Sequence, residues 1–159
     1  MGTQHEKSNF KEENNYISFS LGYEGKTIDE YLNLLIKNNI QVIFDVRRNP
    51  ISRKFGFSKS RLSTYAENIH VKYIHLPSLG VPSKYRKNLI TNDDRKNLFK
   101  FYAKYILNKN SEGLELIRNN LLDNKRIVLT CFESDFRTCH RKIICDLLTR
   151  EFNIDFIHL

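Results

Sequence analysis

The stretch that decides the fold is RIVLTCFESDFRTCHRKIICDLLTR, residues 126–150. Its first five residues, RIVLT, form a short apolar stretch around Ile127–Leu129 with little alternation, which is typical of a strand covered on both faces. A helix is expected from about Cys139, because apolar residues between Ile143 and Leu148 recur at helical spacing. The segment that joins the two parts, residues 131–141, holds two cysteines, a glutamate, a histidine and two arginines. A strand that leads through a short polar segment into a helix indicates an α/β protein.

The rest of the chain repeats this alternation of strands and helices. Because parallel neighbours need a crossover, we expect a single three-layer α/β domain, with a mostly parallel sheet of about five strands and helices on both faces. The domain is expected to span residues 16–159, after a disordered tail at residues 1–15. Strands are expected at 17–21, 42–46, 71–76, 126–130 and 154–159, and helices at about 28–36, 58–68, 92–106, 111–121 and 139–148. The segment 77–92 between them is expected to be a long functional or lid-like loop.

Composition and charge limit the classes of protein. Hydrophobic residues make up 40% of the 159 and charged residues 28%, which is the balance of a soluble globular protein. The chain has neither an apolar run that could span a bilayer nor an N-terminal signal peptide, so we expect no membrane partner. Three cysteines without a Cys-x-x-Cys pair favour a reduced, cytoplasmic setting. The net charge of +8 favours an anionic small molecule or a nucleic acid as partner, or else a generally basic surface.

Polar chemistry follows four of the expected strands at their carboxyl ends. The segments there read GYEGKT, DVRRNPISRKFGF, HLPSLGVPSKYR and CFESDFRTCHR, whereas the amino ends read NNI, NIH and DNK. Ligands collect at the carboxyl ends of parallel strands, because loops and helix N-termini meet there. The sequence therefore predicts one composite site, to which Tyr23, Glu24 and His75 are assigned with the residues discussed next.

The segment after the second strand contains a concentration of cations. Asp45 lies in an apolar run and needs a partner, which Arg47 or Arg53 could provide. Four cations in residues 47–54, with two phenylalanines beside them, could hold a phosphate and stack a base. The alternative is an Asp–Arg pair that braces a loop fixed by Pro50. On the binding interpretation, Ser52 is also assigned to the substrate site.

The segment 131–141 is open to several chemistries. Cys131 or Cys139 could be a nucleophile, with His140 as base and Glu133 as orienter. A metal site from the same cysteines and histidine, with His75 as a further candidate, is a second interpretation, although the spacing matches no common zinc module. The third, a phosphatase loop from Cys131 to Arg137, contains no glycine in its cradle. A buried Cys131, a helix-capping Thr138 and a solvated basic face would be the purely structural outcome.

Four ordered motifs resemble the prokaryotic family catalogued as domain of unknown function 488 (DUF 488). They are LGYEGKTIDEYL, VIFDVRRNPISRKFGFSK, YIHLPSLG and CFESDFRTCHR, and the resemblance covers residues 18 to 150. The hallmarks of the family fall on Gly22, Tyr23, Gly25, Asp45, Val46, Arg47, Pro50, Ser52, Leu79, Gly80, Cys131, Cys139, His140 and Arg141. The resemblance implies an α/β domain in which the loops that carry these residues are important, but it implies no activity. It weakens the phosphatase interpretation, because Arg137 lies outside the family signature.

The function expected from the sequence is an enzyme that acts on a phosphate-bearing substrate, a nucleotide or a nucleic acid. A non-catalytic nucleic-acid-binding module with structural cysteines is the alternative. A third possibility is a scaffold or toxin-like partner protein, which no feature of the sequence specifically indicates. Cofactors and oligomeric state are not predicted, and no residue is assigned as a metal ligand. The expected catalytic residues are Cys131, Glu133, Cys139 and His140, and the expected substrate-binding residues are Tyr23, Glu24, Asp45, Arg47, Ser52, Arg53, His75 and Arg141.

Overall fold

A parallel β-sheet forms the centre of the protein. The computed structural model describes residues 16–123 and 125–159, so the expected disordered tail lies outside the described residues. Within them the sheet has the order β3-β2-β4-β1-β5, and each neighbouring pair is parallel. The strands are β1 (Tyr16–Gly22), β2 (Val42–Asp45), β3 (Lys72–His75), β4 (Ile127–Cys131) and β5 (Ile154–His158).

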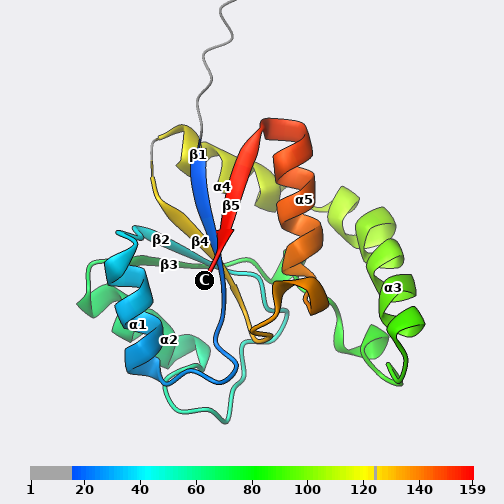
Figure 1. Ribbon diagram of the computed structural model, residues 1–159, viewed down its shortest axis with the longest axis horizontal. Coiled ribbons are helices and arrows are strands. Elements are labelled where there is room, and N and C mark those ends of the chain that lie inside the picture. Colours follow the sequence, from blue (N-terminus) through cyan, green and yellow to red (C-terminus); the bar gives the residue numbers. More distant parts are fainter. Residues whose placement is uncertain (1–15, 124) are drawn as a thin grey trace, which may run out of the picture.

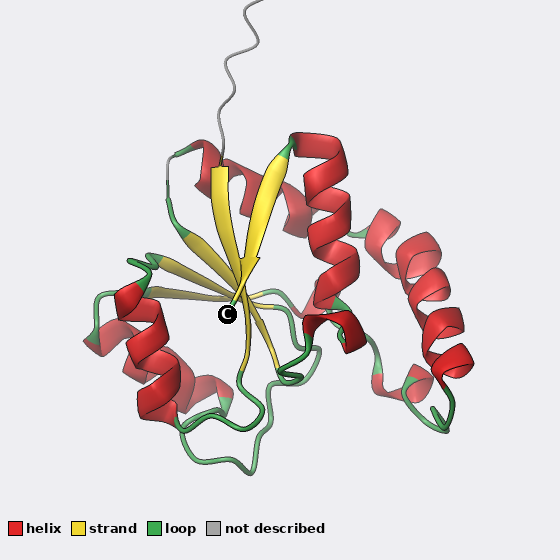
Figure 2. Cartoon of the chain, viewed as in Figure 1, coloured by secondary structure: helices red, strands yellow, loops and turns green. Residues whose placement is uncertain are grey.

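Helices cover both faces of this sheet (Figures 1 and 2). On one face, α1 (Ile28–Lys37) and α2 (Lys59–Asn68) pack against one side of the strands. On the other lie α3 (Asn92–Phe101), α4 (Ser111–Leu122) and α5 (Arg141–Phe152). The expected three-layer α/β fold with a five-stranded sheet is therefore confirmed.

The two hydrophobic cores follow from the alternation of side chains along the strands. Ile43 of β2 joins the core under α1 and α2, and its neighbour Phe44 joins the core under α4 and α5. Val128 and Leu129 divide in the same way on β4. Because every residue of β2 and β4 is buried, these strands read as continuous apolar runs rather than alternating ones.

Local sequence signals account for the helix starts. Thr27 Oγ1 accepts a hydrogen bond from the Glu30 amide at 3.2 Å, and Glu30 Oε2 accepts one from the Thr27 amide at 2.7 Å. The same reciprocal capping box joins Thr91 and Asp94 ahead of α3. No helix among the described residues is both long and apolar enough to cross a membrane.

The helix expected over residues 92–106 changes its winding partway. Regular α3 ends at Phe101, a π-helical turn runs over Tyr102–Ile106, and a 3-10 turn follows over Leu107–Lys109. The wider turn accompanies the burial of Tyr102, whose hydroxyl donates to the Leu79 carbonyl at 2.7 Å. The expected helix is present, but its change of winding was not visible in the local sequence pattern, because propensity along one helix does not register such a distant contact.

The connections of the sheet leave the neighbouring strands β2 and β4 in opposite directions. From β2 the chain passes through α2 to β3, whereas from β4 it passes through α5 to β5 on the opposite side of the strand order. The two helices lie on opposite faces. The neighbouring ends of β2 and β4, where Asp45 pairs with Thr130, are therefore a topological switch point, where open α/β sheets bind ligands.

Candidate functional site

Two cysteines and a histidine meet at this switch point. Cys131 is the last residue of β4, and Cys139 and His140 stand between a 3-10 turn (Phe136–Thr138) and α5. His140 Nδ1 lies 3.9 Å from Cys131 Sγ and 3.8 Å from Cys139 Sγ. All three side chains are buried. We call these three residues the Cys/His cluster.

The imidazole of His140 is held in a fixed orientation. Its Nε2 lies 2.9 Å from the Val46 carbonyl oxygen, which can only accept a hydrogen bond, so Nε2 carries a proton. In the neutral ring the lone pair then belongs to Nδ1, the atom that faces the two sulfurs. The ring of Tyr102 packs edge-on against the imidazole, with centroids 5.5 Å apart.

Arg141 supports the Cys/His cluster from within the protein. Its side chain is 1% exposed and donates to Cys139 Sγ at 3.4 Å, to Ser20 Oγ at 3.0 Å and to the Glu133 carbonyl. It forms no ion pair with any carboxylate in residues 16–123 and 125–159. The sulfur of Cys139 is therefore the polarisable group that lies next to the positive charge of Arg141.

The two sulfurs differ in acidity. Burial alone opposes ionisation of Cys139, but hydrogen bonds with Cys131 and His140 and the charges of His140 and Arg141 hold the pKa of its thiol well below its usual range. The hydrogen bond with Cys139, together with burial, raises the pKa of the Cys131 thiol. Burial and the charge of Cys139 also raise the pKa of Glu133. The environment thus favours one thiolate, on Cys139.

Two glycines permit the close approaches that build the site. A Cβ atom at Gly22, the end of β1, would lie 1.8 Å from the Glu133 carbonyl oxygen. A Cβ at Gly80 would lie 2.2 Å from the Arg48 amide nitrogen, where the segment after β3 crosses the segment after β2. Both family hallmarks therefore have a steric reason in this chain.

A small cavity of about 110 Å³ borders the Cys/His cluster. Its lining includes Glu133, Thr138 and His140 from the segment between β4 and α5, together with Arg86 and Arg95 from the segment before α3 and from α3 itself. In the described part of the chain, neither arginine has an ion-pair or side-chain hydrogen-bond partner. The remaining lining residues are Val81, Leu89, Leu98 and Phe99. The cavity joins two cations to the Cys/His cluster, and we call it the arginine pocket.

Arg47 and Asp45 form a separate buried pair. Arg47 Nε donates to Asp45 at 2.8 Å, and its Nη1 donates to the Tyr23 hydroxyl at 3.0 Å and the Phe57 carbonyl at 2.7 Å. Asp45 also accepts from the Tyr73 hydroxyl. The donors of Arg47 are used by the protein, which favours the bracing interpretation of this pair over direct binding of an anion.

The other expected binding residues lie around the ends of β1, β2 and β3. The Tyr23 ring stacks on Phe57 with centroids 4.3 Å apart, and the exposed carboxylate of Glu24 accepts from the Ser134 amide at 3.0 Å. His75 Nε2 lies 2.9 Å from the Arg47 carbonyl. In contrast, Ser52 accepts from the Lys54 amide, and Arg53 is exposed. Among the described contacts of the Cys/His cluster, none involves Ser52 or Arg53.

Sequence reasoning did not identify Arg86 and Arg95. Arg86 lies in the 77–92 segment that was expected to be functional. Its position in this charged loop could therefore have indicated a binding role. Arg95 follows a capping box in the first turn of α3, a position that usually faces solvent. Only the fold brings it to the same cavity as Glu133.

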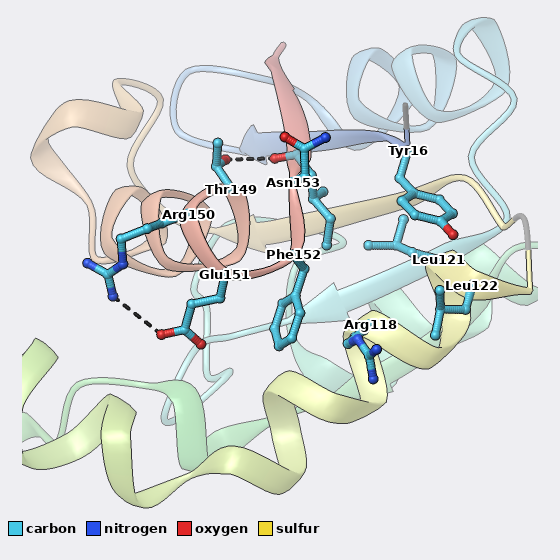
Figure 3. Close-up of a pocket in the computed structure, with 10 residues that line it drawn as sticks. Tyr16, Arg118, Leu121, Leu122, Thr149, Arg150, Glu151, Phe152 and Asn153 are labelled. Atoms are coloured by element: carbon cyan, nitrogen blue, oxygen red, sulfur yellow. Dashed lines mark hydrogen bonds and ion pairs between the residues drawn. The ribbon is translucent and has the colours of Figure 1, made fainter. Parts of the chain in front are cut away.

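A larger hollow of about 640 Å³ lies at the other end of the sheet, between β1, α4 and the end of α5 (Figure 3). Several of its polar side chains already have partners. Arg150 contacts Glu151, Thr149 donates to the Ile154 carbonyl at 2.7 Å, and Arg118 lies over the Phe152 ring. This hollow lies away from the converging thiols and imidazole at the strand carboxyl ends.

The fold and the site define a three-layer α/β protein with a buried Cys/His cluster at the switch point of a parallel sheet. Residues 27–148 match the model of the family described as Domain of unknown function DUF488. The chain belongs to this family, as its motifs indicate. No curated protein and no solved structure matches the chain.

Proposed function

We propose that the protein is an enzyme acting on a phosphate-bearing substrate, a nucleotide or a nucleic acid, whose phosphate enters the arginine pocket. The observation that carries the proposal is the pocket itself, which Arg86 and Arg95 line together with Glu133 and His140. Guanidinium groups bind phosphate oxygens through charge-assisted, often bidentate hydrogen bonds. An anion held there lies next to the reactive groups of the Cys/His cluster.

The size of the pocket supports one phosphate rather than a whole nucleotide. Pockets that enclose drug-sized ligands measure about 300 to 1,000 Å³, and this one measures about 110 Å³. The base and sugar therefore remain outside, against the surface around the pocket. The net charge of +8 favours a polyanionic substrate there.

The roles of the arginines follow from which donors the protein itself uses. Arg86 and Arg95 bind the phosphate, because neither has an internal partner among the described residues. Arg47 and Arg141 act as positioning residues, which brace the end of β2 and the Cys/His cluster. Cys131 or Cys139, with His140 and Glu133, supplies the chemistry. We therefore assign anion binding to Arg86 and Arg95, and no longer to Arg47, Arg53 and Arg141.

Binding and turnover test the proposal separately. The substitutions Arg86→Gln and Arg95→Gln should each weaken nucleotide binding by about tenfold or more, because a hydrogen bond to a charged group contributes about 1.5 to 3 kcal/mol. Calorimetric titration with a panel of nucleotides and short oligonucleotides measures this. The matched control is Arg61→Gln, an exposed cation on α2, which should bind as the wild type does.

Equal weakening by all three substitutions would show that the basic surface, not the pocket, binds the ligand. Turnover of the bound ligand is then assayed in Cys139→Ala, which should bind but not react. Binding that falls steeply with salt, with no turnover and no effect of the cysteine substitution, would identify the non-catalytic nucleic-acid-binding module instead.

A further inference from the structure

The ligand atoms of the Cys/His cluster are spaced like those of a tetrahedral metal site. Cys131 Sγ, Cys139 Sγ and His140 Nδ1 all lie within 4.8 Å of one another, and the two S···N distances are 3.9 and 3.8 Å. Zinc–sulfur and zinc–nitrogen lengths of about 2.3 and 2.0 Å place neighbouring ligand atoms of a tetrahedral site about 3.5 to 3.8 Å apart. The two S···N distances are within a few tenths of an ångström of this range, and the two sulfurs lie no more than 4.8 Å apart, so modest side-chain shifts would let a zinc ion fit among the three atoms.

The support around His140 is also that of a metal ligand. A metal-binding histidine usually donates its second ring N–H to a carbonyl or carboxylate, which fixes the tautomer and turns the other nitrogen to the metal. His140 meets this condition, because Nε2 bonds to the Val46 carbonyl and Nδ1 faces both sulfurs. The edge-on contact with Tyr102 holds the ring in that plane.

The chemistry of the ligands favours zinc. Glu133 Oε2 accepts a hydrogen bond from Cys131 Sγ at 3.4 Å, so a carboxyl group lies next to the sulfurs. Among the described residues, Arg141 is the cationic side chain that bonds to this group. Thiolate and imidazole ligands select zinc over magnesium or calcium, which prefer oxygen.

We propose that Cys131, Cys139 and His140 bind one zinc ion, with its fourth coordination position directed toward Glu133 and the arginine pocket. Three protein ligands and one open position are the arrangement of catalytic zinc sites, whereas structural sites use four protein ligands. Glu133 and His140 line the arginine pocket, and for this reason we place the open position on that side of the Cys/His cluster. The metal site does not depend on phosphate binding by the arginines, because it rests on the ligand set alone. With zinc bound, the two thiolates and the imidazole would hold the metal instead of acting as nucleophile and base.

Metal content of the full-length protein is the first test. Protein purified under reducing conditions without chelator should contain about one zinc per chain by elemental mass spectrometry. After the zinc is removed, titration with Co²⁺ should give the intense sulfur-to-cobalt charge-transfer absorption and the visible bands of a tetrahedral thiolate site. Both measurements use the wild-type chain, so neither depends on whether a variant folds.

The third cysteine provides a matched control. Cys145 is buried in α5 at 4% exposure but lies outside the Cys/His cluster. Cys139→Ala and His140→Ala should abolish the cobalt charge-transfer band or weaken binding by at least a hundredfold, whereas Cys145→Ala should keep stoichiometric metal. Thermal unfolding should shift upward with added zinc in the wild type and in Cys145→Ala, but not in Cys139→Ala.

Several outcomes would overturn the zinc site. These are failure of the reduced wild type to take up zinc or cobalt, a cobalt spectrum without sulfur charge transfer, and equal metal binding by Cys139→Ala and Cys145→Ala. A Cys131–Cys139 disulfide in a chain that takes up no metal after reduction would also do so. None of these results bears on nucleotide binding by Arg86 and Arg95, so the two proposals fail separately.

Discussion

Gly22 is the residue at which a single added carbon would disturb the site most directly. The substitution Gly22→Ala places a Cβ against the Glu133 carbonyl, so the segment after β4 must move. We expect a loss of about 1 to 3 kcal/mol in the free energy of unfolding, the usual cost of overpacking. Because Arg141 bonds to the same carbonyl, the buried cysteines should also react faster with a thiol reagent.

Gly25→Ala is the control for that substitution. Gly25 has a φ of +78°, but in the described structure no atom lies within 4 Å of the position that an added Cβ would take. It should cost about 1 kcal/mol through backbone strain alone and leave thiol reactivity unchanged. Faster thiol reaction in both variants would mean that general destabilisation, not the contact with Glu133, exposes the cysteines.

The Asp45–Arg47 pair predicts a large stability effect. Asp45→Ala leaves a buried guanidinium without its carboxylate and should cost about 3 to 5 kcal/mol in chemical denaturation. Asp146→Ala removes the partner of Lys142 from an exposed pair and should cost less than about 1 kcal/mol. Comparable losses in the two variants would contradict the bracing role.

The closeness of side chains in space could be predicted where the residues lie near one another along the chain. The thiols and imidazole of the Cys/His cluster belong to one strand–loop–helix unit, so local reasoning brought them together. Arg86 and Arg95 come from other segments and meet the unit only through folding. The roles of Arg47 and Arg141 depend on whether their N–H groups already donate to other protein groups. The sequence does not contain that information.

At the scale of elements, the capping box of α1 makes a separable contribution. Thr27→Ala removes the acceptor of the Glu30 amide and should lower the free energy of unfolding by about 1 kcal/mol. Thr64→Ala, on the exposed side of α2, removes a hydroxyl that bonds only to the preceding turn and should have a smaller effect. Urea denaturation of both variants measures the difference, and an equal loss would argue against the cap.

The same cap makes stability depend on pH. Hydrogen bonds from the Thr27 backbone and side chain lower the pKa of Glu30 below its ordinary value of 4.5. Its stabilising contribution is therefore fully present above pH 4.5 and is lost as the pH falls through the lowered value. The stability difference between the wild type and Glu30→Ala should be largest near neutral pH and should disappear in strong acid.

Elements that begin with a local signal were predicted better than those whose form depends on distant contacts. The starts at Thr27 and Thr91 follow from reciprocal side-chain and backbone bonds within four residues. The π-helical turn at Tyr102 occurs together with a hydrogen bond to Leu79, more than twenty residues away. The final helix was expected near Cys139 and begins at Arg141, because a 3-10 turn comes first.

For the whole molecule, we expect uneven local stability. In α3 no residue is buried, whereas α4 and α5 bury residues such as Ile117 and Leu148 against the sheet. Backbone amides in α3 should therefore exchange with deuterium faster than those in α4 and α5. Protection of α3 equal to that of α5 would contradict this. Binding of a phosphate ligand should slow exchange in α3, which carries Arg95.

The fold class followed from alternation of strands and helices, but the strand order did not. Periodicity tells which residues form a strand and which faces are covered, and two-sided burial of β2 and β4 was visible in their composition. Nothing in the local pattern says that β4 inserts between β1 and β2. That placement depends on long-range pairing, and it creates the switch point where the site lies.

The strand order has a consequence for synthesis of the chain on the ribosome. Of the five strands, β1 is made first, yet its sheet neighbours are β4 and β5, which are made last. Until residue 158 has emerged from the ribosome, Phe19 and Leu21 of β1 lack their native surroundings. The nascent chain therefore exposes apolar surface that chaperones or other nascent chains can bind. The strands β2 and β3, joined by α2, can pair earlier. During a long interval of translation the sheet therefore lacks β4, its central strand.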